Sequence, residues 1–124
     1  MEIKEKIQSF TNLIVWQEGH KLVLDIYKAT KVFPNEEMFG LTNQMRRAAV
    51  SITSNIAEGF NRRSAKDKSH FYAIAHGSVA EIQNQLLIAR DIKYIGKPEF
   101  SQIAERTVLV HKLLTGLIKS VLRS

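Results

Sequence analysis

The sequence predicts an all-α protein, an antiparallel up-down-up-down four-helix bundle. Apolar residues recur every three to four positions in four long segments, which is the period of an α-helix. No segment shows the alternation of apolar and polar residues that marks a β-strand. The connections between the four segments are short, and short connections favour antiparallel neighbours.

A chain of 124 residues predicts a single domain, spanning residues 1–124. The hydrophobic share of 44% is enough for a core, and the absence of cysteine excludes disulfides and thiolate metal sites. Residues 1–12 have no clean period, so we expect a frayed or flexible lead-in. No apolar run resembles a secretory signal or approaches the ~20 residues that span a bilayer, so we expect a cytoplasmic protein with no membrane association.

The first helix is predicted over residues 13–31. Pro34 ends this segment, because the residue before a proline is pushed out of the α region. Asn35 is then predicted to cap a short helical turn that contains Glu36 and Glu37. Two adjacent lines of residues form a wide, mostly apolar stripe: Val15, Gly19, Leu22, Ile26, Ala29 and Phe33, and beside them Trp16, His20, Val23, Tyr27 and Thr30.

The stretch 40–63 predicts the second helix, with Gly59 as its natural stop because glycine accepts the left-handed conformation. Its second face is polar but built from short side chains beside two adjacent arginines, which suggests a surface that another molecule packs against. The apolar line is Leu41, Met45, Ala48, Ile52 and Ile56, and the polar line is Asn43, Arg47, Ser51, Ser54 and Glu58.

The third helix is predicted to begin at Ser64, which forms a capping box with Asp67, and to run to about Tyr94. Gly96 ends it, and Pro98 begins a fourth helix that reaches about Leu122. The expected core lines are Phe71, Ile74, Ser78, Ile82, Gln85, Ala89 and Ile92 on the third helix, with Ala75, Val79, Leu86 and Lys93 adjoining. On the fourth helix the core line is Ile103, Thr107, Val110, Leu114, Leu117 and Val121. Leu87 on the third helix and Leu109 and Leu113 on the fourth are surplus apolar side chains, which could fill a wide core or lie on an oligomer surface.

Glycines fall inside three of the predicted helices, at Gly19, Gly77 and Gly116. Each costs about 1 kcal/mol relative to alanine. We expect this cost to be offset by close approach of another backbone, within the bundle or between subunits. The alternative is that each glycine is a tolerated substitution with no structural role.

The residue patterns of known catalytic and metal sites are missing. The only acid-x-x-His spacing joins Asp67 to His70, whereas di-metal bundles use a Glu-x-x-His pair on each of two helices. No Gly-x-Ser-x-Gly nucleophile elbow and no glycine-rich phosphate loop occurs. We therefore expect no enzymatic activity, no catalytic residue, no cofactor and no metal.

The net charge of +6 is unevenly distributed. Residues 1–59 are neutral, and the excess lies at 60–70 and beyond, which suggests a polyanionic partner; a solvated basic surface is the alternative. Phe60, Phe71 and Tyr72 could stack on unpaired bases, although packing is the favoured role of Phe71. The nucleic-acid-binding candidates are Arg62, Arg63, Lys66, Lys68, Lys112, Lys119 and Arg123.

The stretch NQMRRAAVSITSNIAEGFNR resembles the signature of the small four-helix-bundle proteins encoded in bacterial 23S rRNA intervening sequences. VWQEGHKLVLDIYKATKVFP resembles the first helix of that family and HFYAIAHGSVAEIQNQLLIARDIKYI its third, so the similarity covers about 13–96. One departure is Thr53, where the family often has proline, and its absence predicts a straighter second helix. The residues that carry the match, and are candidates for assembly, are Gln44, Arg46, Arg47, Ser51, Asn55, Glu58 and Gly59.

The resemblance implies a homo-oligomer, with a pentameric ring as the expected form. Similar proteins are accessory subunits of diversity-generating retroelement reverse transcriptases. We therefore expect a non-enzymatic homo-oligomer that binds RNA or DNA, rRNA included, through a basic surface. The alternative is a scaffold whose partner is another protein, such as a reverse transcriptase. Arg46 and Arg47 could also form ion pairs with Glu58 or with a neighbouring subunit.

Overall fold

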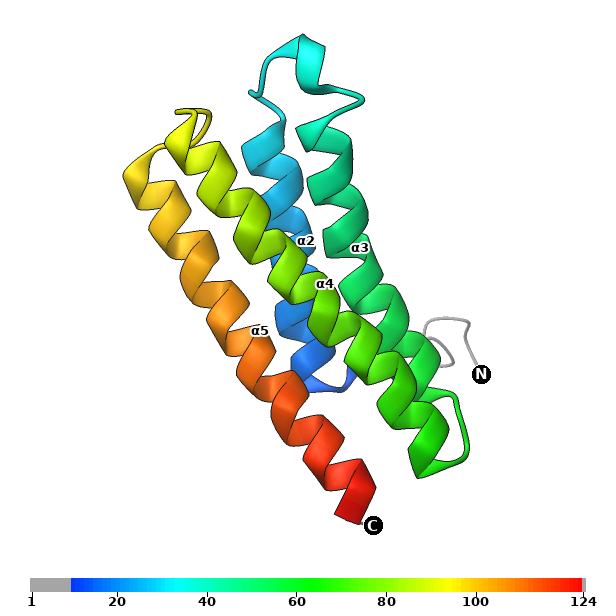
Figure 1. Cartoon of the computed structure of the whole chain (residues 1–124). Helices are drawn as coiled ribbons and strands as arrows, with labels where there is room; N and C mark the ends of the chain where they lie inside the picture. The colour runs from blue at the N-terminus through cyan, green and yellow to red at the C-terminus, as the bar shows by residue number, and fades with distance from the viewer. Residues whose placement is uncertain (1–9, 124) are drawn as a thin grey trace.

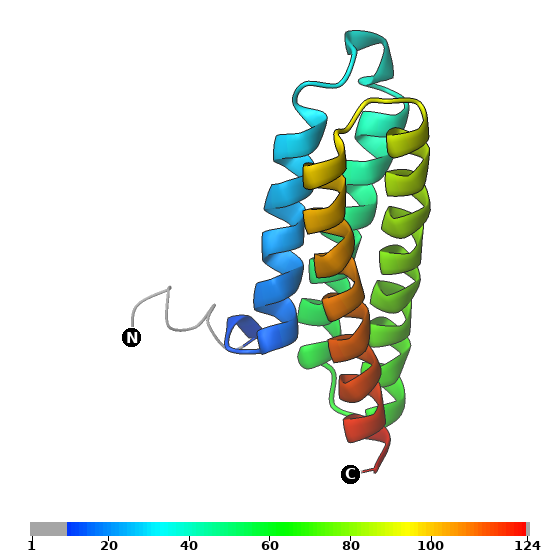
Figure 2. The same cartoon turned by 90° about the vertical axis from the view of Figure 1, so that its left-hand side faces the viewer.

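The computed structural model describes residues 10–123 and confirms the four-helix bundle (Figure 1). The helices lie side by side in the order α2–α3–α4–α5, with α5 closing back on α2. Successive helices run in opposite directions (Figures 1 and 2). No strand occurs within the described range, which comprises α2 (Ile14–Thr30), the 3-10 turn η1 (Asn35–Glu37), α3 (Leu41–Phe60), α4 (Ala65–Asp91) and α5 (Lys97–Arg123).

Most of the predicted lead-in, at residues 1–9, lies outside the described residues. The segment that follows is attached to the bundle. The ring of Phe10 meets the ring of Trp16 edge-on at 5.6 Å, and the side chain of Gln17 donates to the backbone carbonyl of Thr11 over 2.9 Å. Residues 10–13 thus pack against the first turns of α2.

The predicted core faces are correct for α3 and α5. On α2 the line from Val15 to Phe33 is correct, whereas His20 and Tyr27 of the adjacent predicted line are exposed. Each helix buries the line of apolar residues that its 3.6-residue period selects. α3 runs unbroken through Thr53. The fully buried side chains on these three helices include Leu22, Ile26, Met45, Ile52, Ile56, Ile103, Val110 and Leu114.

The predicted core line of α4 is wrong at both ends. Ile74 and Ile92 are exposed and Phe71 is only half-buried, whereas Tyr72 is 2% exposed and lies in the core. The middle of the line, from Ser78 to Ala89, is correct. α4 carries apolar residues around its whole circumference, so its periodicity does not select one face.

Both glycines that were predicted to end helices have other roles. Gly59 lies inside α3, and none of the described glycines has a positive φ. A Cβ at Gly59 would lie 2.6 Å from Cε1 of Tyr72, so the glycine makes room for that ring. α4 ends at Asp91, before Gly96, and Lys93 takes the left-handed position with φ 67°.

The C-terminus of α4 is therefore a Schellman motif without glycine. The amide of Tyr94 donates to the carbonyl of Ala89 over 2.8 Å, and the amide of Lys93 donates to that of Arg90 over 3.1 Å. These two bonds satisfy carbonyls that have no partner within the helix.

The two predicted N-caps have different outcomes. Ser64 accepts a hydrogen bond from the amide of Asp67 at 3.1 Å, which confirms the cap of α4. Asn35 makes no capping bond, because it lies inside the 3-10 turn and Pro34 precedes it. Glu37 instead caps α3 by accepting from the amide of Leu41 over 3.1 Å. The same carboxylate accepts from the hydroxyl of Tyr94 over 2.8 Å, and this bond raises the pKa of Tyr94.

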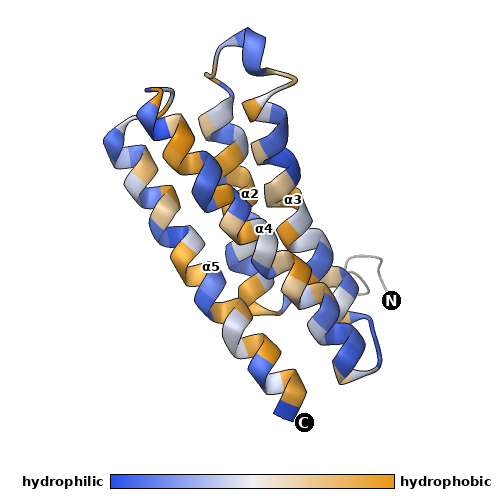
Figure 3. Cartoon of the chain, viewed as in Figure 1, coloured by the Kyte–Doolittle hydropathy of each residue, from blue (hydrophilic) through white to orange (hydrophobic). Residues whose placement is uncertain are grey.

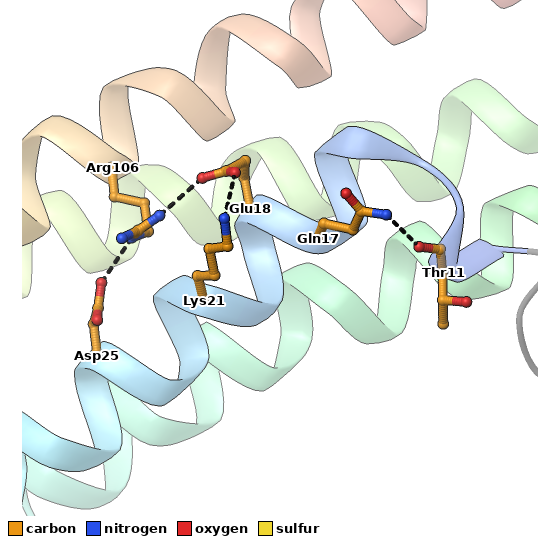
Figure 4. Close-up of polar contacts among 6 residues, drawn as sticks. All are labelled: Thr11, Gln17, Glu18, Lys21, Asp25 and Arg106. Carbon is orange, nitrogen blue, oxygen red and sulfur yellow. Dashed lines mark hydrogen bonds and ion pairs between the residues drawn. The ribbon is translucent and has the colours of Figure 1, made fainter.

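A charged cluster that the sequence analysis did not identify joins α2 to α5 (Figure 4). The guanidinium of Arg106 donates to Asp25 and to Glu18, each over 2.8 Å. Lys21 also reaches Glu18 at 3.1 Å. The hydrogen bond from Lys21 is the main reason that the pKa of Glu18 is lowered, and the charge of Arg106 adds to it.

Two imidazole rings lie close together between α4 and α5, tilted by 35° to each other. The ring centres of His76 and His111 are 3.9 Å apart, and Nε2 of His76 is 3.1 Å from the hydroxyl of Thr115. Burial lowers the pKa of His76, and the neighbouring His111 lowers it further. The folded chain therefore resists protonation at His76.

We expect the chain to lose stability as the pH falls through the ordinary histidine range. The unfolded chain then binds a proton that folded His76 refuses, so the free energy of unfolding decreases toward acid. Thermal unfolding of the wild type and of His76→Gln between pH 7.5 and 5.5 checks this. The variant should show a smaller fall in Tm, and parallel profiles would contradict the assignment.

Candidate nucleic-acid interface and assembly face

Basic side chains from two distant parts of the chain gather at one end of the bundle. α3 and α5 run in the same direction, so the α3–α4 connection and the C-terminus of α5 lie at the same end (Figures 1 and 2). The connection carries Arg62 and Arg63, the first turn of α4 carries Lys66, and the last two turns of α5 carry Lys119 and Arg123. We call these five residues the basic end.

Most of the basic end is open to solvent. Arg63, Lys66, Lys119 and Arg123 are exposed, and none has an ion pair within residues 10–123. Arg62 pairs with Glu58 at 2.8 Å, with both side chains about half exposed, and its guanidinium lies 4.7 Å from the ring centre of Phe71. An exposed pair of this kind contributes less than about 1 kcal/mol, so Arg62 can exchange Glu58 for a phosphate.

Two predicted binding residues lie apart from this cluster. Lys68 is half-buried, and its ammonium donates to the carbonyl of Phe60 over 2.7 Å and to that of Gly59 over 3.4 Å. It therefore satisfies the C-terminal carbonyls of α3. Lys112 is exposed on α5, eleven residues before Arg123, which is ~16 Å along the helix.

The aromatic residues near the basic end offer little for base stacking. Tyr72 is buried, so its predicted role in stacking is wrong, and burial raises the pKa of its hydroxyl. Phe60 and Phe71 are half-buried beneath Lys68 and Arg62, respectively. This end is suited to phosphate contact rather than base recognition.

The residues that carry the family resemblance divide into an inward and an outward group. Arg46 turns toward α2, where Nε donates to the hydroxyl of Thr30 over 2.9 Å and the guanidinium lies 4.6 Å from the ring centre of Tyr27. Asn55 bonds to the carbonyl of Ser51 over 2.8 Å, and Gly59 packs beneath Tyr72. Neither Arg46 nor Arg47 pairs with Glu58, which is bound to Arg62.

The outward group lines a groove between α3 and α4. Gln44, Arg47 and Ser51 form one side, and Ser78, Glu81 and Gln85 form the other. The hydroxyl of Ser78 donates to that of Ser51 over 2.9 Å, which ties the two helices together at the floor. The sequence analysis named Gln44, Arg47 and Ser51 as assembly candidates, but it did not single out Glu81 and did not place these residues in one groove.

The exposed face of α4 beside this groove is almost uncharged. Only Glu81 is charged among the exposed residues between 73 and 88. Hydrophobic segments recur along α4 in Figure 3. The other exposed residues of this face are Ala73, Ile74, Gly77, Ala80, Asn84, Leu87 and Ile88.

Within residues 10–123, no group of three or more histidine or acidic side chains could hold a metal ion. The described helices also include none that is long and apolar enough to cross a bilayer.

Comparisons with known proteins identify the family. A search of the curated proteins finds no match. The fold is similar to that of a protein of unknown function from the S23 ribosomal protein family of Bacteroides thetaiotaomicron. The TM-score is 0.78 at 22% identity, over 86% of this chain and 96% of that one. The family model for 23S rRNA-intervening sequence proteins matches residues 11–116. With that match covering most of its length, the chain belongs to the 23S rRNA-intervening sequence protein family.

Proposed function

We propose that this chain is a non-enzymatic homo-oligomer that binds RNA or DNA through the basic end. The observation that supports this most directly is that Arg63, Lys66, Lys119 and Arg123 gather at one end with no carboxylate partner among the described residues. Arginine and lysine side chains on such a surface neutralise phosphates and release counterions. The likeness to proteins from rRNA intervening sequences makes structured RNA the first ligand to test.

The oligomer that we propose is a ring, pentameric as the resemblance implies. The nearly uncharged face of α4 supports assembly, because a surface that exposes several apolar side chains together is often covered by a partner. A ring would also repeat the basic end around one rim, so several copies could contact one nucleic acid and gain affinity through multivalency.

A double variant, Arg63→Ala with Lys66→Ala, tests the binding surface. Lys68 is left intact because it bonds the end of α3. We expect affinity for structured RNA to fall about tenfold, with the slope of log affinity against log salt reduced by about 2. The measurement is a fluorescence anisotropy titration at fixed salt, combined with circular dichroism to confirm folding.

The matched control removes two exposed cations from the opposite end of the bundle, Lys28→Ala with Lys31→Ala. This control removes the same number of positive charges as the test variant. It should therefore show only the small loss of RNA affinity that a lower net charge causes. An equal loss of affinity in both double variants would show that RNA does not bind specifically at the basic end.

The exposed apolar face of α4 also favours a second function, that of a scaffold for another protein such as a reverse transcriptase. In that case the wild type would form a stable oligomer without measurable affinity for RNA or DNA, and its protein partner would bind at α4.

A further inference from the structure

The connection between α2 and α3 presents an aromatic side chain to solvent. This connection, drawn in cyan, projects beyond the end of the bundle in Figures 1 and 2. The side chain of Phe39 is 92% exposed, and that of Met38 beside it is 47% exposed. No other large hydrophobic side chain of residues 10–123 is as exposed as Phe39. A phenylalanine with almost all of its surface in water gains no hydrophobic stabilisation from the fold of its own chain.

The exposure of Phe39 does not come from a loosely held connection. Glu37 accepts hydrogen bonds from the amide of Leu41 over 3.1 Å and from the hydroxyl of Tyr94 over 2.8 Å, so it ties the connection to both α3 and the α4–α5 connection. The ring centres of Phe33 and Tyr94 lie 5.2 Å apart. The backbone around Phe39 is therefore fixed, and a side chain held in advance loses less entropy when it binds.

A groove between α4 and α5 has the size and the lining to hold such a side chain. Its volume is about 280 Å³, whereas a cavity of about 150 Å³ with apolar walls is enough to bind benzene. No charged residue lines this α4–α5 groove, and its two polar residues bond to each other, since the amide of Gln83 donates to the hydroxyl of Thr107 over 3.2 Å. The apolar lining includes Leu86, Leu87, Phe100 and Val108, of which Leu87 and Val108 are 44% and 54% exposed.

The charges beside the two features are complementary. Glu36 lies three residues before Phe39 and is exposed, without an ion pair in the described part of the chain. Lys93 and Lys97 are also exposed and also lack an ion pair there. Both line a pocket that adjoins the α4–α5 groove, because Phe100 lines the two together. Opposite charges placed beside an apolar contact guide the encounter and fix its register.

We propose that Phe39 of one copy of the chain inserts into the α4–α5 groove of a second copy, with Glu36 facing Lys93 and Lys97 beside that groove. Both halves of the contact are carried by the same chain, so no other kind of protein is needed. Each copy donates one ring and accepts another, and such a heterologous contact builds a ring of subunits where the rotation between copies closes. This inference rests on the homo-oligomer of the proposed function and adds to it which surfaces join. Phe39 and the basic end lie at opposite ends of the bundle, so the basic end stays open to RNA.

Two variants disable the two halves of the contact separately. Phe39→Ser removes the ring, and Val108→Glu places a carboxylate in the groove, where it repels Glu36. Both wild-type side chains are more than half exposed, and glutamate is a better helix former than valine, so each variant should fold. The matched control is Leu24→Glu, because Leu24 is 56% exposed, close to the 54% of Val108, but lies on α2 and outside the groove. Oligomer mass is followed by sedimentation over a dilution series, and circular dichroism confirms folding.

We expect each test variant to need at least about a tenfold higher concentration than the wild type to assemble, whereas Leu24→Glu should not. A mixture of the two test variants should form a species of two chains. In that species the intact ring of Val108→Glu occupies the intact groove of Phe39→Ser. The species cannot grow further, because the other ring and the other groove are disabled.

Wild-type assembly of either test variant would overturn this contact and leave the homo-oligomer standing. A mixture that forms no two-chain species, even at about tenfold the concentration that assembles the wild type, would also overturn the contact. A wild type that is monomeric throughout would refute the homo-oligomer of the proposed function, and this contact with it.

Discussion

Replacing Tyr72 by alanine is expected to lower the free energy of unfolding by about 3–5 kcal/mol, the usual cost of deleting a buried aromatic side chain. The ring of Tyr72 is 2% exposed and packs on Gly59, where α3 and α4 meet. Because Gly59 has no side chain to fill the vacated space, the cavity cannot close without moving the backbone. Urea unfolding monitored by circular dichroism measures the change.

Phe71→Ala is the matched control, since it removes a similar ring from the next position. Phe71 is half-buried and covered by Arg62, so its loss should cost clearly less than that of Tyr72. Tyr72→Phe keeps the ring and should cost less than about 1.5 kcal/mol. Equal destabilisation by Phe71→Ala and Tyr72→Ala would mean that the core line predicted from the sequence, with Phe71 inside, is correct after all.

The error at Phe71 and Tyr72 shows where periodicity fails. On α3 and α5 polar residues mark the outer face, so the inner face follows from the spacing alone. On α4 several residues outside the core, such as Ile74 and Ile88, are as apolar as those inside it. An apolar outer face removes the contrast that a prediction needs, and it is also the feature that supports a partner for α4.

A second kind of error in the sequence-based prediction concerns Gly59 and Lys68. A glycine or a lysine can play more than one structural role, and the sequence alone does not show which. Gly59 could have been a helix stop or a site of close packing, and only the position of Tyr72 decides between them. In the sequence, Lys68 looks like one more cation of the basic run that begins at Arg62. Its ammonium bonds to carbonyls eight and nine residues earlier, which becomes visible only once α3 and α4 are paired.

The two candidate surfaces were predictable to different degrees. The basic run of Arg62, Arg63 and Lys66 is local in the sequence, and its meeting with Arg123 follows from the up-down topology. The groove between α3 and α4 joins Gln44 to Gln85, 41 positions apart, and depends on the rotation of two helices about their axes. Patterning does not determine that rotation for α4, so this groove could not have been foreseen.

The salt dependence of RNA binding is the second large expected effect and tests the proposed function most directly. If four side chains of the basic end contact phosphates, raising monovalent salt from 50 to 200 mM should weaken binding by roughly 50- to 150-fold, because each contact releases a counterion. The measurement is an anisotropy titration of wild-type protein with structured RNA, with oligomer mass checked at both salt concentrations. A steep linear fall of log affinity against log salt is the predicted result. An affinity that stays flat across this range, or no binding at 50 mM, would contradict the account.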